Sequence, residues 1–150
     1  MKKVIAIALA IVLVLTLGVT VALAAPPQGA GAEKEFLYDK PAWSCENGAM
    51  PQEGAATFGF VVLNTNASGD LIVEVALKGA TPNAQYTIWV NQWVGDCPTT
   101  PTGTLMTNGK GNGNGHVVEA RVPAAQHFWV SAVTYEGGLQ VLRSTSVQLD

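Results

Sequence analysis

Apolar and polar residues alternate in short stretches from Phe36 onward. In LIVEVALK, every second residue from Leu71 is leucine or valine and would lie on one face of a strand, while Glu74 and Lys78 would lie on the other. No stretch repeats apolar residues at the spacing of an amphipathic helix, and clusters of Gly, Asn, Pro and Asp separate the alternating runs. The pattern predicts strands at Thr57–Asn64, Leu71–Leu77, Gln85–Trp93, Gly103–Thr107, His116–Val122, His127–Thr134 and Leu139–Gln148, with a short one at Phe36–Tyr38.

Seven or eight short strands and no helical pattern predict an all-β domain, an antiparallel Greek-key, Ig-like β-sandwich that follows an N-terminal apolar leader helix. The same alternation assigns faces. In HVVEARV we expect Val118, Ala120 and Val122 to point into the core and Glu119 to point outward. In LQVLRSTSVQL the alternation changes phase around Arg143, which indicates a bulge or bend there.

The stretch TNGKGNGNGH, residues 107–116, has the glycine content of a ligand-binding loop but lacks the chemistry of one. A phosphate-binding loop needs Ser or Thr after its lysine and then a helix, whereas Lys110 is followed by Gly111 and a predicted strand. A calcium loop needs carboxylates, and this stretch contains none. Asn-Gly between two strands is typical of a hairpin, so we expect Gly103–Thr107 and His116–Val122 to pair.

The loop in VALKGATPNAQYTIWV carries Leu77, Gly79, Pro82 and Tyr86. This pattern resembles the tyrosine corner of fibronectin type III and Ig-like sandwiches. The resemblance implies that the Tyr86 hydroxyl bonds back to the backbone of the preceding turn, which is a structural role. Together with the glycine run, the pattern also resembles small secreted prokaryotic β-sandwich proteins of unassigned function, and that likeness implies no chemistry.

The N-terminal residues have the layout of a secretory signal peptide: two lysines, the apolar run Val4–Leu17 and an A-x-A site ending at Ala24. We predict a signal peptide over residues 1–24, a flexible linker over 25–35 and a β-sandwich domain over 36–150. The alternative is an uncleaved membrane anchor, because the uncharged residues through Ala25 are numerous enough to span a bilayer. Both interpretations place the domain outside the cytoplasm.

The charge balance limits the classes of partner. The chain has 11 acidic and 8 basic side chains and a formal net charge of −3, so it lacks the basic surface that binds nucleic acid or anionic lipid. We expect an extracellular protein or glycan as partner, no nucleic acid, and membrane contact only through the N-terminal segment. Cys45 and Cys97 are predicted to form a disulfide in an oxidising compartment, with two buried free thiols as the alternative.

Candidate catalytic chemistry is sparse. No nucleophile elbow is present, and His116 and His127 belong to no metal-binding motif. We therefore predict a non-catalytic protein with no catalytic residues, no metal site and no cofactor. The alternative is an extracellular hydrolase or metal-binding protein that uses these two histidines with loop carboxylates.

The aromatic residues of QYTIWVNQW are the most informative feature for function. Alternation places Trp89, Asn91 and Trp93 on the outer face of one strand, and Trp129 on the outer face of another. Indole combines an apolar plate with a polar edge, so such a face suits a sugar or a protein partner. The predicted binding site comprises these four residues. It is either an open platform or a surface covered by residues 36–50, which the disulfide would bring close to it.

Overall fold

The computed structural model describes residues 31–97 and 100–149, and in this part of the chain all regular structure is β-strand. The predicted all-β class is confirmed. The strands are β1 (Glu33–Asp39), β2 (Ala42–Ser44), β3 (Gly48–Met50), β4 (Thr57–Thr65), β5 (Leu71–Leu77), β6 (Gln85–Trp93), β7 (Gly103–Met106), β8 (Gly113–Glu119), β9 (His127–Thr134) and β10 (Gln140–Ser144).

The predicted leader falls on residues 1–24, which lie outside the described residues, as does most of the predicted linker. Strand β1 begins at Glu33, inside the segment expected to be linker. Among the described residues, no helix has the length and apolar character needed to cross a membrane.

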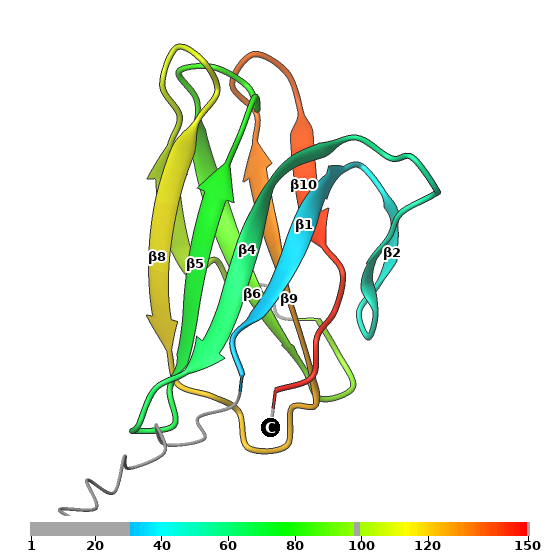
Figure 1. Cartoon of the computed structure of the whole chain (residues 1–150), viewed down its shortest axis with the longest axis vertical. Coiled ribbons are helices and arrows are strands. Elements are labelled where there is room, and N and C mark those ends of the chain that lie inside the picture. Colours follow the sequence, from blue (N-terminus) through cyan, green and yellow to red (C-terminus); the bar gives the residue numbers. More distant parts are fainter. Residues whose placement is uncertain (1–30, 98–99, 150) are drawn as a thin grey trace, which may run out of the picture.

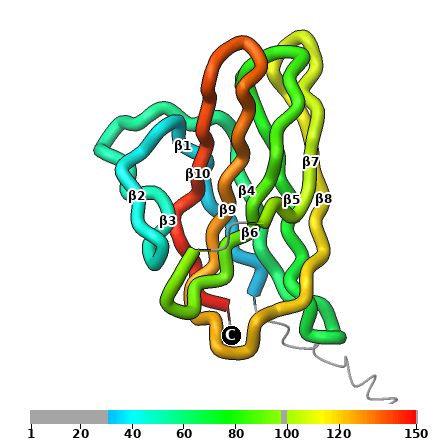
Figure 2. The backbone as a smooth tube through the Cα atoms, turned by 180° about the vertical axis from the view of Figure 1, so that it is seen from behind, coloured from blue at the N-terminus to red at the C-terminus, as the bar shows by residue number. Residues whose placement is uncertain are grey.

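Eight strands form one antiparallel sheet in the order β7-β6-β9-β10-β1-β4-β5-β8. The sheet is rolled into two layers, with β1, β4, β5 and β8 in front of β6, β9 and β10 (Figure 1). Pairing of β1 with β10 joins the layers on one side, and on the other side the edge strands β7 and β8 lie against each other (Figure 2). The result is a nearly closed, barrel-like sheet.

The core fills the space between the two layers. It is built from the alternate residues that the sequence pattern assigned inward in β5 and β6, joined by matching positions of the other strands. The largest fully buried side chains of this core are Tyr86, Phe128, Leu37, Leu63, Leu71, Leu77, Ile88 and Leu142.

The face assignment of β8 from the sequence is wrong. Val117 is 5% exposed and Val118 is 54% exposed, so Val117 points into the core and Glu119 shares its face. Adjacent valines fit either phase of alternation, and the partner strand decides between them. Val117 lies opposite Val73 of β5, which is fully buried.

The expected pairing of the strands around the glycine run is also wrong. Strand β7 pairs with β6, and β8 pairs with β5, so the run crosses between layers at their seam. Gly113 and Gly115 belong to β8 and face inward. A Cβ on Gly113 would lie 2.5 Å from the Met106 carbonyl oxygen, and one on Gly115 would lie 3.0 Å from Ile88 Cδ1. The absence of side chains therefore lets β7 approach β8 closely.

The predicted tyrosine hydrogen bond is present. The Tyr86 hydroxyl accepts a hydrogen bond from the Thr81 amide at 2.9 Å and donates one to Gln140 Oε1. The glycine run supports the same corner, because the Ala80 amide donates to the Gly111 carbonyl at 3.0 Å. The β5–β6 connection is thereby fixed to the hairpin of β9 and β10.

The phase change predicted near Arg143 occurs just after β10. Leu142 and Ser144 are buried, after which burial switches to Val147 and Leu149. Phe128 and Val147 exchange two backbone hydrogen bonds of 2.9 Å, so the chain still follows β9 beyond the end of the strand. The shifted alternation lets the C-terminal residues continue to cover the core.

A two-stranded ribbon, β2–β3, lies outside the main sheet and was not predicted. Its turn is held by Asn47, whose backbone and side-chain nitrogens donate to Ser44 Oγ at 3.0 and 3.1 Å. Within this turn, Cys45 forms the predicted disulfide with Cys97, with the Cα atoms 5.4 Å apart. The ribbon is thus attached to the segment that follows β6.

Candidate binding groove

The outward side chains of β6, β9 and β10 form cross-strand rows on the outer surface of the rear layer. In the central row, Trp89 lies opposite Ser131, and Ser131 lies opposite Arg143. In the next row toward the start of β6, Thr87 lies opposite Val133, which lies opposite Val141. Residues directly opposite each other in adjacent strands have side chains in contact range, so each row is a continuous strip of surface.

These rows form a groove because short side chains lie between long ones. Ser131, Val133 and Val141 form the floor, while Trp89 and Arg143 rise on either side. The cavity has a volume of about 290 Å³, close to the lower end of the range for small-ligand sites. The remaining lining residues close its two ends: Trp43, Asn91, Cys97 and Trp129 at one, and Tyr135 and Leu139 at the other.

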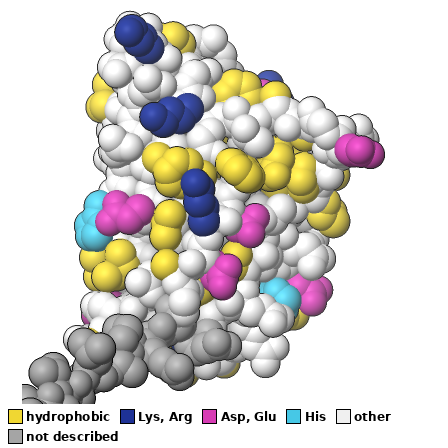
Figure 3. Space-filling view, viewed as in Figure 1, with side chains coloured by type: hydrophobic (Ala, Val, Ile, Leu, Met, Phe, Trp, Pro, Cys, Tyr) yellow, Lys and Arg dark blue, Asp and Glu magenta, His cyan; other side chains and the backbone are white. Residues whose placement is uncertain are grey.

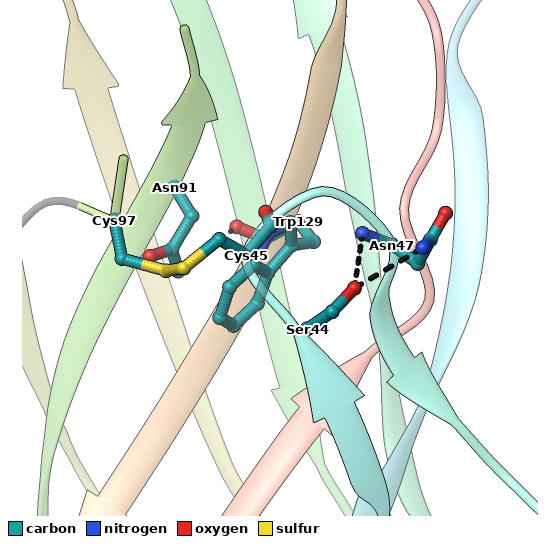
Figure 4. Close-up of a disulfide and its surroundings, with 6 residues drawn as sticks. All are labelled: Ser44, Cys45, Asn47, Asn91, Cys97 and Trp129. Atoms are coloured by element: carbon teal, nitrogen blue, oxygen red, sulfur yellow. Dashed lines mark hydrogen bonds between the residues drawn. A yellow bond between two sulfur atoms is a disulfide. The ribbon is translucent and has the colours of Figure 1, made fainter. Parts of the chain in front are cut away.

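The β2–β3 ribbon forms the aromatic end of the groove. Trp129 is 2% exposed, and its Nε1 donates a hydrogen bond to the Cys45 carbonyl oxygen at 2.8 Å. The Trp43 ring lies 5.6 Å from the Trp129 ring and is itself 43% exposed. Figure 4 shows the disulfide passing beside Trp129, between Cys97 and Cys45. The disulfide and the indole hydrogen bond thus hold the ribbon against β9.

Asn91 serves mainly to brace this end of the groove. Its Nδ2 donates to the backbone carbonyls of Trp89 and Trp129, at 3.3 and 3.4 Å. The side chain lies beside the disulfide (Figure 4) and is almost fully buried. Asn91 therefore fixes the strand that carries Trp89 relative to the strand that carries Trp129.

The structure brings three of the four predicted site residues to the groove, namely Trp89, Asn91 and Trp129. Trp93 lies on the same face but outside the groove lining, where its ring packs edge-on against His127 with centroids 5.5 Å apart. The two alternatives, an open platform and a surface covered by residues 36–50, each describe part of this face. The ribbon covers Trp129, whereas the surface beside Trp89 stays open as the groove.

Arg143 is a charged member of the groove that the sequence prediction did not include. Its Cζ lies 4.4 Å from the centre of the Trp43 ring, a cation–π contact. Its Nε is buried without a hydrogen-bond partner, and no described residue forms an ion pair with it. Burial lowers the pKa of the guanidinium from its ordinary value, yet an arginine remains charged at neutral pH.

Trp43, Tyr135 and Leu139 were also missed as groove residues. Tyr135 and Leu139 are the first and last residues of the loop YEGGL, where strand alternation ends, so the sequence pattern alone does not assign their faces. Arg143 did have a recognisable signal, because it is the one charged residue in β10, whose other residues are uncharged. Its position opposite Ser131 depends on strand pairing, which local sequence does not reveal.

The histidines lie apart from the groove. His116 Nδ1 is 2.6 Å from Glu74 Oε1, but both side chains are 56% exposed, on the outer face of the other layer. Charged and hydrophobic side chains are interspersed over that layer (Figure 3). Neither histidine lines the groove. Among residues 31–97 and 100–149, no three His, Cys, Asp or Glu side chains are placed to share a metal ion.

Comparison with protein-family models, with curated proteins and with solved structures found no match. The function is therefore inferred from the groove and its surroundings.

Proposed function

We propose that this protein is a secreted or cell-surface, non-catalytic β-sandwich module that binds a sugar ring of a glycan in the groove between Trp89 and Arg143. The observation that carries the proposal is the make-up of the groove, in which a floor of short side chains lies between the Trp89 indole on one side and Arg143 on the other. An indole plate stabilises the apolar C–H face of a sugar ring by burying it, while the ring's hydroxyl groups stay at the polar edge.

The dimensions favour a ring over a broad protein contact. Trp89 and Arg143 are separated by one intervening strand, and two strand spacings amount to roughly 10 Å. Protein–protein interfaces need a much larger surface, about 800 Å² on each partner. A cavity of about 290 Å³ matches a small rigid ligand group better.

Two further predictions accompany this proposal. The leader-like N-terminal sequence and the Cys45–Cys97 disulfide both support an extracytoplasmic location, because disulfides persist in oxidising compartments. The Tyr86 hydrogen bond to Thr81 supports the expected kinship with Greek-key, Ig-like sandwiches.

Replacing the partly buried indole of Trp89 tests the proposal. Titration with soluble oligosaccharides of neutral hexoses and of uronic acids, followed by calorimetry, should identify a ligand for the intact protein. Trp89→Ala should weaken its binding at least about tenfold, because a central aromatic side chain carries a large share of such an interface.

Trp93→Ala is the matched control, since Trp93 lies on the same face of β6 but outside the groove. It should leave the affinity unchanged. Thermal unfolding of both variants separates lost binding from lost folding. The proposal fails if no oligosaccharide binds, or if Trp89→Ala binds as well as the unchanged protein.

A further inference from the structure

We propose that the groove selects an acidic sugar, a uronic acid whose carboxylate pairs with Arg143. This inference deepens the proposed sugar-binding function and rests on it. It starts from the one groove residue whose charge is not satisfied within the described part of the chain. Arg143 contacts the Trp43 ring, while its Nε is buried without a hydrogen-bond partner.

The surroundings of Arg143 keep its charge uncompensated. Its cross-strand neighbours are Ser131 on β9 and Tyr38 on β1, and neither is an acidic residue. A guanidinium that is partly removed from water without a partner is unfavourable. A ligand carboxylate on the two Nη groups, which unlike Nε are not buried unpartnered atoms, would offset part of that cost. The overall charge of the protein is negative, so this positive group is a local exception rather than part of a basic surface.

The contact with Trp43 suits a carboxylate in particular. The Trp43 ring lies against the guanidinium, with Cζ 4.4 Å from the ring centroid, and does not use its N–H groups as hydrogen-bond donors. A carboxylate has two oxygens that match two of those N–H groups in a bidentate pair. A ligand ring above Ser131, between Trp89 and Arg143, would place a ring carboxylate beside those N–H groups.

Matched ligands isolate the contribution of the carboxylate. Oligomers of galacturonate, glucuronate and mannuronate are each compared with their methyl esters, which keep the ring and remove the charge. At least one acid should bind about tenfold or more tightly than its ester, and its affinity should fall as salt is raised. Sulfated oligosaccharides and a glutamate-rich peptide serve as competing anions.

Two substitutions test the residue itself. Arg143→Met keeps an apolar stem over Trp43 and should abolish the preference for acid over ester, whereas Arg143→Lys keeps the charge and should retain only part of it. Lys34→Met is the control, because Lys34 also lies over an aromatic ring, 4.0 Å from Phe60, but on the other layer. Unfolding midpoints verify that each variant is folded.

The outcomes separate this inference from the proposed function. Equal affinity for acid and ester, with binding still dependent on Trp89, overturns the role of Arg143 and leaves sugar binding intact. The role of Arg143 in binding a uronic acid is also overturned if only the peptide or only the sulfated sugars bind in an Arg143-dependent way and no uronic acid does. If no acid and no ester binds, both proposals fail.

Discussion

Glu119, the last residue of β8, shares the inward face of Val117 and lies opposite the buried Leu71. Its Oε2 is buried without a hydrogen-bond partner. Burial raises the pKa of this carboxyl above its ordinary value of 4.5, and a hydrogen bond with Gln92 opposes the shift only in part. The ionised form of Glu119 is therefore less stable, relative to the protonated form, in the folded protein than in the unfolded chain.

The sign of the pH effect follows from that direction. Because the folded state binds the proton of Glu119 more tightly, its contribution to the free energy of unfolding is greatest below pH 4.5 and declines as pH rises through the folded-state pKa. We expect Glu119→Gln to stabilise the protein at pH 7 and to flatten the dependence of stability on pH. Urea unfolding at pH 4.5 and pH 7 measures both effects.

Glu53→Gln is the control for that experiment, since Glu53 is an exposed loop residue whose substitution also removes one negative charge. It should change stability little at either pH. If Glu119→Gln is no more stable than the unchanged protein at pH 7, burial of the carboxylate is not costly and the interpretation is wrong.

At the scale of elements, the β2–β3 ribbon depends on a glycine at its contact with β9. Gly48 has a φ of 61°, and a Cβ there would lie 2.6 Å from the Ser144 carbonyl oxygen and 2.8 Å from Trp129 Cγ. The ribbon can approach the indole this closely only because residue 48 has no side chain. Gly48 thus determines how closely the ribbon packs against Trp129 at the aromatic end of the groove.

Gly48→Ala should lift the ribbon away from Trp129. Gly79→Ala is matched to it, because Gly79 has a φ of 62° but no atom within 4 Å of its Cβ position. Both variants incur the left-handed backbone strain of about 1–2 kcal/mol, and Gly48→Ala should lose about 1–3 kcal/mol more through the clash. Denaturant unfolding gives these values, and tryptophan emission should shift to the red only in Gly48→Ala. Equal losses in the two variants would exclude a special packing role for Gly48.

Strand positions could be predicted from the sequence because each inward residue is decided by local alternation, as in β5 and β6. Alternation gives no answer where adjacent residues suit both faces, as with Val117 and Val118, or where inward positions are glycine, as with Gly113 and Gly115. In those places the cross-strand partner determines the face. The β2–β3 ribbon escaped prediction because strands of three residues are too short to show a period.

The candidate site was predictable only along single strands. Trp89 and Asn91 were assigned to one outer face because they lie two positions apart on β6. Arg143 joins them through two successive antiparallel pairings, β6 with β9 and β9 with β10. The register of those pairings is a property of the folded sheet, so the sequence around Arg143 could not place it beside Ser131.

For the molecule as a whole, the Cys45–Cys97 disulfide joins the ribbon to the segment that follows β6, across a sequence separation of 52. Chain-entropy arguments give such a link a stabilisation of about 4 kcal/mol. We expect the Cys45→Ser/Cys97→Ser variant to lose stability of this order and to expose Trp129. Denaturant unfolding and acrylamide quenching measure the two effects.

The unchanged protein treated with reductant should behave like the double variant, and the variant should not respond to reductant. Quenching that is the same with and without the disulfide would show that the indole hydrogen bond to Cys45 and the packing of Gly48 hold the ribbon by themselves.

The pairing of β1 with β10 has a consequence for how the protein reaches this structure. Leu37 lies opposite Ser144, so the first strand of the sheet closes against the last one, and the two layers are joined at that point. Contacts between distant parts of the chain slow folding, because the ends must meet before the contact contributes. In a chain that is synthesised or exported N-terminus first, β1 appears long before β10. The edge of β1 that pairs with β10 therefore stays unpaired until β10 has emerged. The sheet can thus close only after the C-terminal residues have emerged.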